Sequence, residues 1–298
     1  MKIRKNVLTA VCLAAIGTSS LIFTGCGNSS KDSSASKSQS DQIHVVSRED
    51  GSGTREAFSE ITKILEKKGD KKVDHTLPDA IIQNSTEAVM STVSTDKSTI
   101  GYISLGSLND TVKALKVDNV EATPENIKAD KYKLARPFLV VYKGTPDAAT
   151  QDLLKFILSD QGQEMVTKNG YISVGGKGKY TPAKLKGHIA ISGSTSVTPL
   201  MEKMVEQYEK ENPNVSIDIQ SNGSSAGITD TINGGSNLGM SSRNLKGDEP
   251  SKLNQVKIGI DGIAVIVNKD NSLGNVSLQQ LTDIYTGKIK YWSQLESK

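Results

Sequence analysis

Four short turns rich in glycine, serine and threonine carry residue types suited to holding an anion. The first three lead into segments with helical periodicity, and a helix start offers unpaired N–H groups and the positive end of its dipole. Glycine lets the backbone approach a ligand, and hydroxyls donate hydrogen bonds without charge. Each turn alone is consistent with helix capping, but the four together favour a shared anion site. They are 48–54 (REDGSGT), 193–196 (GSTS), 223–227 (GSSAG) and 239–243 (GMSSR).

Two charged residues in the first turn indicate which anion would fit. Arg48 supplies a planar guanidinium suited to a tetrahedral oxyanion. Asp50 would repel an anion unless the ligand carries a proton for it to accept. Phosphate near neutral pH is largely monoprotonated, whereas sulfate is not. Asp50 as an acceptor therefore predicts phosphate over sulfate; the alternative is that it only pairs with Arg48 or caps the next helix.

The elements that must position these turns read as alternating strands and helices. Helical spacing follows the first turn, Ser85 and Asp147, and Thr198 is a plausible cap with Pro199 at the first helical position. This alternation predicts an α/β architecture with mainly parallel sheets. The expected strands are 43–47, 100–104, 138–142, 188–192, 215–219, 238–241 and 263–267.

The first residues indicate export rather than fold. A basic start, an apolar run over 7–23 and Thr-Gly before Cys26 form a secretory signal over 1–25 that resembles a bacterial lipobox. Cys26 would then carry the lipid, and the polar stretch 26–41 would be a flexible tether. The alternative is a signal anchor that stays in the membrane, but the run is short and diluted by serine and threonine.

Composition excludes several classes of protein. The chain has 298 residues, with 36% apolar and 23% charged residues, which is neither a disordered nor a wholly membrane-embedded composition. Two cysteines (Cys12 and Cys26) and three histidines leave no disulfide scaffold and little for a metal site, so we expect neither metal nor cofactor. The net charge of +3 is too weak for a nucleic-acid binder, and it lies in Lys2, Arg4 and Lys5 of the signal.

Several motifs together resemble one family. They are RxDGSGT, GSTSVTPL, NGSSAGI, LGMSSR, DGIAVIVN and IYTGKIKYW, and they look like the phosphate-binding (PstS-type) lipoprotein of the bacterial high-affinity phosphate ABC importer. The resemblance implies a two-lobed periplasmic-binding-protein (type II) fold and a monomeric, non-enzymatic receptor. This receptor would be lipid-anchored outside the cell membrane and would deliver inorganic phosphate to a permease with a cytoplasmic ATPase. The implied phosphate contacts come from Arg48, Asp50, Ser52, Gly53, Thr54, Thr195, the backbone of Ser196, the hydroxyl of Ser224, and the position of Ser242.

The chain departs from the family pattern in two residues and in order. Many relatives carry aspartate at Ser242 and phenylalanine at Ser196, which leaves the roles of Ser242 and Arg243 open. RxDGSGT here precedes GSTSVTPL, and YTGKIKYW ends the chain, so the order looks circularly permuted through the turn-rich linker 175–187. Extended, this linker reaches roughly 43 Å. The expected lobes are 136–268, and 41–135 with 269–298. The alternative is a truncated tandem duplication or a misassembled gene whose product does not fold.

Two rival functions remain. GSSAG matches the G-x-S-x-G nucleophile elbow of hydrolases, but no histidine follows it, so the base would have to be His188. The other rival is a binding protein or sensor for another oxyanion. A P-loop is excluded because GGKGK over 175–179 lacks the required spacing and the Ser/Thr after lysine.

Overall fold

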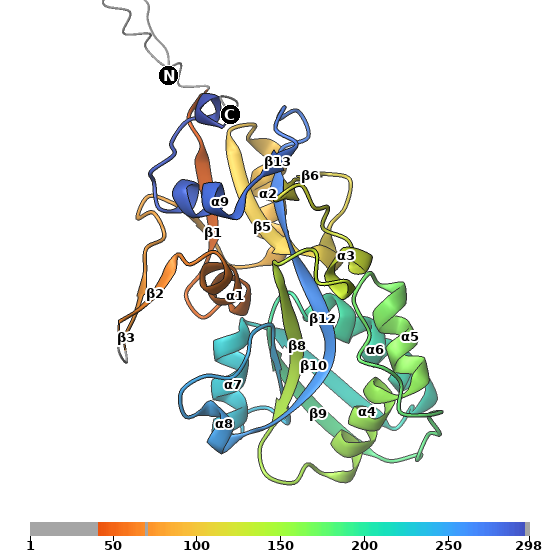
Figure 1. The fold of residues 1–298 in the computed structure, drawn as a ribbon. Helices are drawn as coiled ribbons and strands as arrows, with labels where there is room; N and C mark the ends of the chain where they lie inside the picture. Colours follow the sequence, from red (N-terminus) through yellow and green to blue (C-terminus); the bar gives the residue numbers. More distant parts are fainter. Residues whose placement is uncertain (1–40, 69–70, 296–298) are drawn as a thin grey trace, which may run out of the picture. The chain divides into compact units, whose positions relative to one another are not determined.

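The computed structural model describes residues 41–68 and 71–295 (Figure 1). The expected signal, Cys26 and nearly all of the expected tether lie outside the described residues. Over the described part of the chain, no helix combines the length and apolar character needed to cross a membrane.

The fold is α/β, as predicted, and is built on a large mixed sheet. Its strand order is β10-β9-β11-β8-β12-β5-β1-β4, and β6 pairs with β12. Two short pairs, β13 with β7 and β2 with β3, lie outside this sheet. The bounds are β1 His44–Arg48, β2 Leu65–Lys68, β3 Lys71–Asp74, β4 Ile81–Gln83, β5 Thr99–Ser104, β6 Lys113–Ala114, β7 Lys116–Val117, β8 Ala135–Tyr142, β9 Gly187–Gly193, β10 Val215–Ser221, β11 Leu238–Ser241, β12 Asn254–Val267 and β13 Asn275–Val276.

The centre of this sheet is antiparallel, which corrects the expectation of mainly parallel sheets. Parallel pairs lie at its two ends, β10–β9–β11 and β4–β1–β5. Between them, β8 pairs antiparallel with β11 and β12, and β12 pairs antiparallel with β5. The reason is that β12 is one long strand, which pairs with β8 through its first part and with β5 through its last.

Most helices begin where local chemistry predicts. Asp147, Ser159 and Ser277 accept hydrogen bonds from backbone N–H groups in the first turns of α4, α5 and α9. Thr198 is itself the first residue of α6, so it is not the cap as predicted. The bounds are α1 Gly53–Ile61, α2 Thr86–Thr95, α3 Pro124–Lys128, α4 Ala148–Leu158, α5 Asp160–Lys168, α6 Thr198–Glu211, α7 Ser224–Asn233, α8 Glu249–Lys252 and α9 Leu278–Tyr285.

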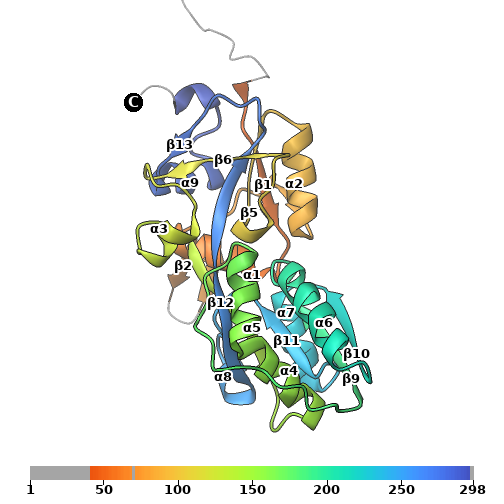
Figure 2. The same cartoon turned by 90° about the vertical axis from the view of Figure 1, so that its right-hand side faces the viewer.

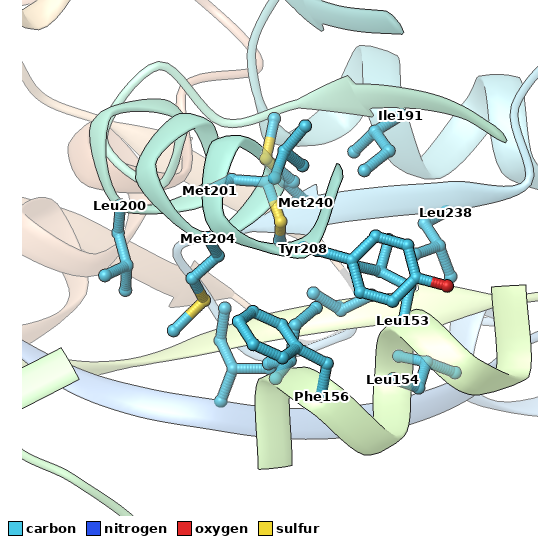
Figure 3. Close-up of a cluster of buried hydrophobic side chains, with 14 of the residues drawn as sticks. Leu153, Leu154, Phe156, Ile191, Leu200, Met201, Met204, Tyr208, Leu238 and Met240 are labelled. Atoms are coloured by element: carbon cyan, nitrogen blue, oxygen red, sulfur yellow. The ribbon is translucent and has the colours of Figure 1, made fainter. Parts of the chain in front are cut away.

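Two large hydrophobic cores lie on either side of the antiparallel centre. In the first, α4, α5 and α6 cover one face of the sheet from β10 to the first half of β12 (Figure 2), and Phe156, Met204 and Tyr208 pack together there (Figure 3). The second core joins α1 and α9 to β1, β5 and the end of β12, with Phe58 stacked on Tyr102. Residues 263–267, expected within the continuous lobe, pack in this second core and in a smaller cluster with α2.

The linker 175–187 is fastened to the first core. Tyr180 Oη donates to Asp152 Oδ2 at 2.6 Å and accepts from Asn212 Nδ2 at 2.9 Å. Tyr208 Oη donates to the same Asp152 oxygen at 3.1 Å. The turn-rich segment therefore has a defined anchor on α4.

The two ends of the described chain are neighbours. Ile43 N donates to Lys290 O at 2.8 Å, and Gln42 forms a β-bridge with Tyr291. Ser293 donates to Asp41 through its backbone N at 3.0 Å and its hydroxyl at 2.6 Å. A short connection would therefore suffice to join residue 295 to residue 41.

Candidate functional site

Arg48 ends β1 and is the buried cation of the site, with 1% of its surface exposed. Its Nη2 donates to Thr195 Oγ1 at 2.9 Å, and its Nε donates to Gln83 O at 3.2 Å. Nε and Nη2 also donate to the two carboxylate oxygens of Glu49, each at 2.8 Å. Arg48 therefore joins the first glycine-rich turn to the second, as the shared-site hypothesis requires.

The start of α1 meets the second turn through hydroxyls. Thr54 Oγ1 lies 2.9 Å from Ser196 Oγ, and both residues are buried. Ser52 is the N-cap of α1 and accepts from Arg55 N at 3.3 Å. Thr86, at the start of α2, adds a further buried hydroxyl 3.3 Å from Ser196 Oγ. Thr86 was missed because a threonine after Ser85 reads simply as part of a helix start.

The third and fourth turns meet the same helix start. Ser242 N donates to Ser224 Oγ at 3.1 Å, and Ser194 Oγ donates to Ser242 Oγ at 2.9 Å. Gly53 packs against these hydroxyls so closely that a Cβ there would lie 2.3 Å from Ser224 Oγ and 2.7 Å from Ser242 Oγ. A side chain at this position would therefore displace both hydroxyls.

The electrostatics of the cluster favour an anion. Ser225, in the first turn of α7, donates its backbone N–H to Gly51 O at 3.0 Å, so the N-termini of α1 and α7 lie beside one another. Two positive dipole ends, the Arg48 guanidinium and a set of buried hydroxyls therefore converge. A tetrahedral oxyanion is the ligand class that uses all these donors at once.

Asp50 lies outside this cluster, whereas the sequence predicts that it faces the ligand. Its side chain is 97% exposed, and Oδ1 lies 2.9 Å from Nη1 of Arg55. Gly51 has φ +87°, a left-handed conformation that turns the chain between Asp50 and the cap Ser52. The alternative roles of Asp50 are wrong, because Ser52 is the N-cap of α1 and the Asp50 carboxylate pairs with Arg55 rather than with Arg48.

Glu49 supplies the carboxylate at Arg48, and sequence reasoning missed it. Its side chain is 24% exposed, and both oxygens face the guanidinium. The position of an acidic residue directly after Arg48 could have predicted this ion pair. Below the pair, Tyr102 Oη accepts from Arg48 N at 3.3 Å, and burial raises the pKa of Tyr102, so this hydroxyl stays neutral.

Arg243 turns away from the hydroxyl cluster. Its Nη1 and Nη2 donate to the two carboxylate oxygens of Glu249 at 2.8 and 2.9 Å, and its Nε lies 3.0 Å from Glu56 Oε2. The Arg243 guanidinium thus forms ion pairs with Glu249 and Glu56, and it reaches the start of α7 only through Ser225 Oγ, to which Nη2 donates at 3.2 Å.

The hydrolase alternative finds no support in the geometry of the described residues. Ser224 contacts Ser242, whereas His188 contacts Ser216 and Asp218 on β10. No nucleophile–base pair forms at GSSAG within the described part of the chain. A cluster of three or more His, Cys, Asp or Glu side chains able to hold a metal is also absent from residues 41–68 and 71–295.

Comparison with known proteins defines the class first. A family model described as "PBP superfamily domain" matches residues 20–161 and 178–298, so the chain belongs to the PBP superfamily. The phosphate-binding protein PstS 2 of Streptococcus pneumoniae is 48% identical over 293 residues, covering 98% of this chain and 99% of the relative. Within the superfamily, the chain therefore belongs to the PstS-type phosphate-binding proteins.

A solved structure and a more distant relative complete the comparison. The crystal structure of a phosphate-binding protein of a phosphate ABC transporter from Streptococcus pneumoniae matches with a TM-score of 0.70 and 48% identity, covering 86% of this chain and 100% of that one. The phosphate-binding protein PstS of Staphylococcus saprophyticus is 33% identical over 132 residues, which is 42% of this chain and 41% of the relative.

Proposed function

We propose that this protein is a non-enzymatic receptor that binds inorganic phosphate outside the cytoplasm and delivers it to an ABC-type permease with a cytoplasmic ATPase. The observation that carries this proposal is the buried Arg48 guanidinium at the meeting point of two helix N-termini and a set of hydroxyls. The names of the relatives, phosphate-binding proteins, support the same ligand.

The proposed ligand set follows from these contacts. Arg48 supplies charge, the start of α1 supplies backbone and hydroxyl donors, and the turns before α6 and α7 supply further hydroxyls. Because these groups come from both sides of the antiparallel centre, binding draws the two cores together, and the permease would recognise that closed form. Asp50 is left out of the set, which consists of Arg48, Ser52, Gly53, Thr54, Thr195, Ser196, Ser224 and Ser242.

Calorimetric titration with phosphate and with sulfate tests the ligand. We expect tight phosphate binding, strong rejection of sulfate, and severe loss of binding on Arg48→Ala, because that change removes the cation and leaves the Glu49 carboxylate unpaired beside the anion. Equal affinity for both anions would instead favour a general oxyanion receptor. Delivery is tested by phosphate uptake in cells that lack the gene and carry either the wild type or Arg48→Ala.

Circular permutation is the second part of the proposal. The match to the staphylococcal relative covers about two fifths of each chain. A partial match is expected if the two chains share a fold but carry its segments in a different order, because one alignment can then follow only one block of segments. The streptococcal relative matches from end to end, consistent with a shared order. A circular permutation needs one place where the chain ends are joined and one where the chain is opened. Here Asp41 and Ser293 lie together, so the ends could be joined there, and the exposed linker 175–187 could be opened.

Lipid attachment at Cys26 is the third part. A secretory signal followed by Thr-Gly-Cys supports a receptor that is anchored by one lipid. Metabolic labelling with a fatty acid should mark the wild type and be lost on Cys26→Ala. An unlabelled wild type would overturn the anchor and leave the proposed ligand untouched.

A further inference from the structure

A cluster of charged side chains lies beside the anion site and contains none of the residues that we propose to contact phosphate. Glu56 Oε2, on α1, lies 3.0 Å from Arg243 Nε in an ion pair and accepts a hydrogen bond from Lys246 Nζ at 2.5 Å. The Arg243 side chain is 3% exposed and that of Glu56 13%. Burial opposes ionisation of Glu56, but hydrogen bonds from Lys246 and Lys72 and the charge of Arg243 outweigh it and lower its pKa. Glu56 is therefore ionised at neutral pH.

The two ends of this cluster belong to different cores. Glu56 lies on α1, whose Ala57 and Phe58 pack in the second core. Arg243 and Lys246 follow β11, whose Leu238 and Met240 pack in the first core. The contacts of Glu56 therefore cross between the two parts that the proposed ligand also joins.

Each end also has a partner on its own side. Arg243 is held by the bidentate contact with Glu249 and by the carbonyl of Asn244, to which Nη1 donates at 2.9 Å. On the other side, Lys72 Nζ lies 2.9 Å from Glu56 Oε1. Separating the two parts would thus break the contacts of Glu56 with Arg243 and Lys246 without leaving a buried charge unpaired, because the Lys246 side chain is 43% exposed. Since an unpaired buried charge is the costly outcome, this arrangement makes the crossing contacts reversible.

Arg243 also connects the cluster to the anion site. It directly follows Ser242, and its Nη2 donates to Ser225 Oγ at 3.2 Å. Ser225 in turn donates its backbone N–H to Gly51 O, next to the start of α1. The position of Arg243 is thus coupled to the two helix starts that hold the anion.

We propose that Glu56, Arg243 and Lys246 form an inter-core latch that sets how long a bound anion is retained. The latch rests on the proposed function, because it acts on release of the phosphate held at Arg48. It contacts no ligand, and its residues are positioning residues. Its contacts form only when the two cores are together, so it slows dissociation and leaves the initial encounter with phosphate unchanged.

Stopped-flow measurement of phosphate association and release with the full chain tests the latch. Glu56→Gln should raise the release rate about tenfold, between the effects typical of exposed and of buried ion pairs, with the association rate nearly unchanged. Glu60→Gln is the matched control, because Glu60 lies one turn further along α1 and pairs with Lys72 at 2.9 Å on its own side. We expect the control to release phosphate at the wild-type rate.

A second variant guards against a folding defect in the first. Lys246→Met removes the more exposed cation and should also speed release; combined with Glu56→Gln it should add little, because the two share one contact. If the wild type binds phosphate and both single variants release it at the wild-type rate, the latch is wrong and the proposed function stands. If the wild type does not bind phosphate, the proposed function fails and the latch fails with it.

Discussion

At the scale of single residues, the turn 48–54 places two neighbouring carboxylates in opposite surroundings. Glu49 lies on the Arg48 guanidinium, while Asp50 faces solvent and pairs with Arg55. The positive φ of Gly51 redirects the chain between these carboxylates and the helix start. The carboxylate beside the Arg48 guanidinium is therefore Glu49, and the proposed phosphate would meet this one.

The two carboxylates give a matched pair of variants. Glu49→Gln removes a negative charge next to the anion, so we expect sulfate to bind roughly tenfold more tightly, while protonated phosphate, which can donate to a carboxylate, gains less. Asp50→Asn should leave both affinities near those of the wild type. Calorimetric titration of each variant with both anions measures this, and relaxed selectivity in Asp50→Asn alone would contradict it.

At the scale of elements, β8 and β12 carry a buried ion pair where the sheet passes from one core to the other. Arg136 Nη2 donates to Asp261 Oδ2 at 3.0 Å, and the two residues are directly opposite in the antiparallel register. Their side chains are 1% and 0% exposed. Such a pair is costly to break, because removing one partner leaves the other charge buried and uncompensated.

Two variants distinguish the cost of leaving one charge of the ion pair unpaired from the cost of removing both charges. Asp261→Asn should lower the free energy of unfolding by about 3–5 kcal/mol, because it strands the Arg136 charge. Arg136→Met combined with Asp261→Leu should cost less than the single change, since apolar side chains need no partner. Denaturant unfolding measures both, and a double variant less stable than Asp261→Asn would rule out this explanation.

The sequence was a good guide to elements with local signals and a poor guide to the long strand. Ser85, Asp147 and the glycines before α1 and α7 act within a few residues, so those helix starts could be predicted. The contact of Arg48 with Thr195 could be inferred because both turns have the composition of an anion site. The length of β12 could not, because its polar first half pairs with β8 only in the folded sheet. The outward turn of Asp50 depends on one backbone angle at Gly51.

At the scale of the whole molecule, the carboxylates of the latch region predict acid sensitivity. Burial opposes ionisation of Glu249 as it does that of Glu56, but hydrogen bonds and nearby cations lower both pKa values below the ordinary 4.5. A lowered pKa means that the unfolded chain takes up protons first as the pH falls, so the stability is fully present above 4.5 and is lost below it. Thermal unfolding without phosphate should give a flat midpoint from pH 7 to pH 5 and a falling one below. In the double variant Glu56→Gln and Glu249→Gln, the midpoint should fall less steeply below pH 5. An unchanged fall would show that these two carboxylates are not the cause of the acid sensitivity.

The proposed permutation predicts that a circular permutant of this chain, with the segment order of the family, keeps the anion site. Joining residue 295 to residue 41 by a short Gly/Ser connection and opening the chain between Gly175 and Gly178 keeps the Tyr180 anchor and every strand intact. We expect this variant to unfold cooperatively and to bind phosphate within about threefold of the wild type, because chain openings in exposed turns are tolerated. The matched control opens the chain between Gly259 and Ile260 inside β12, which should prevent folding, because that strand pairs with β8 and β5. Circular dichroism and calorimetry compare the two. If the reordered chain folds but no longer binds phosphate, the present order of segments helps to build the site. The same residues in the same fold would then lack the contacts between the two cores.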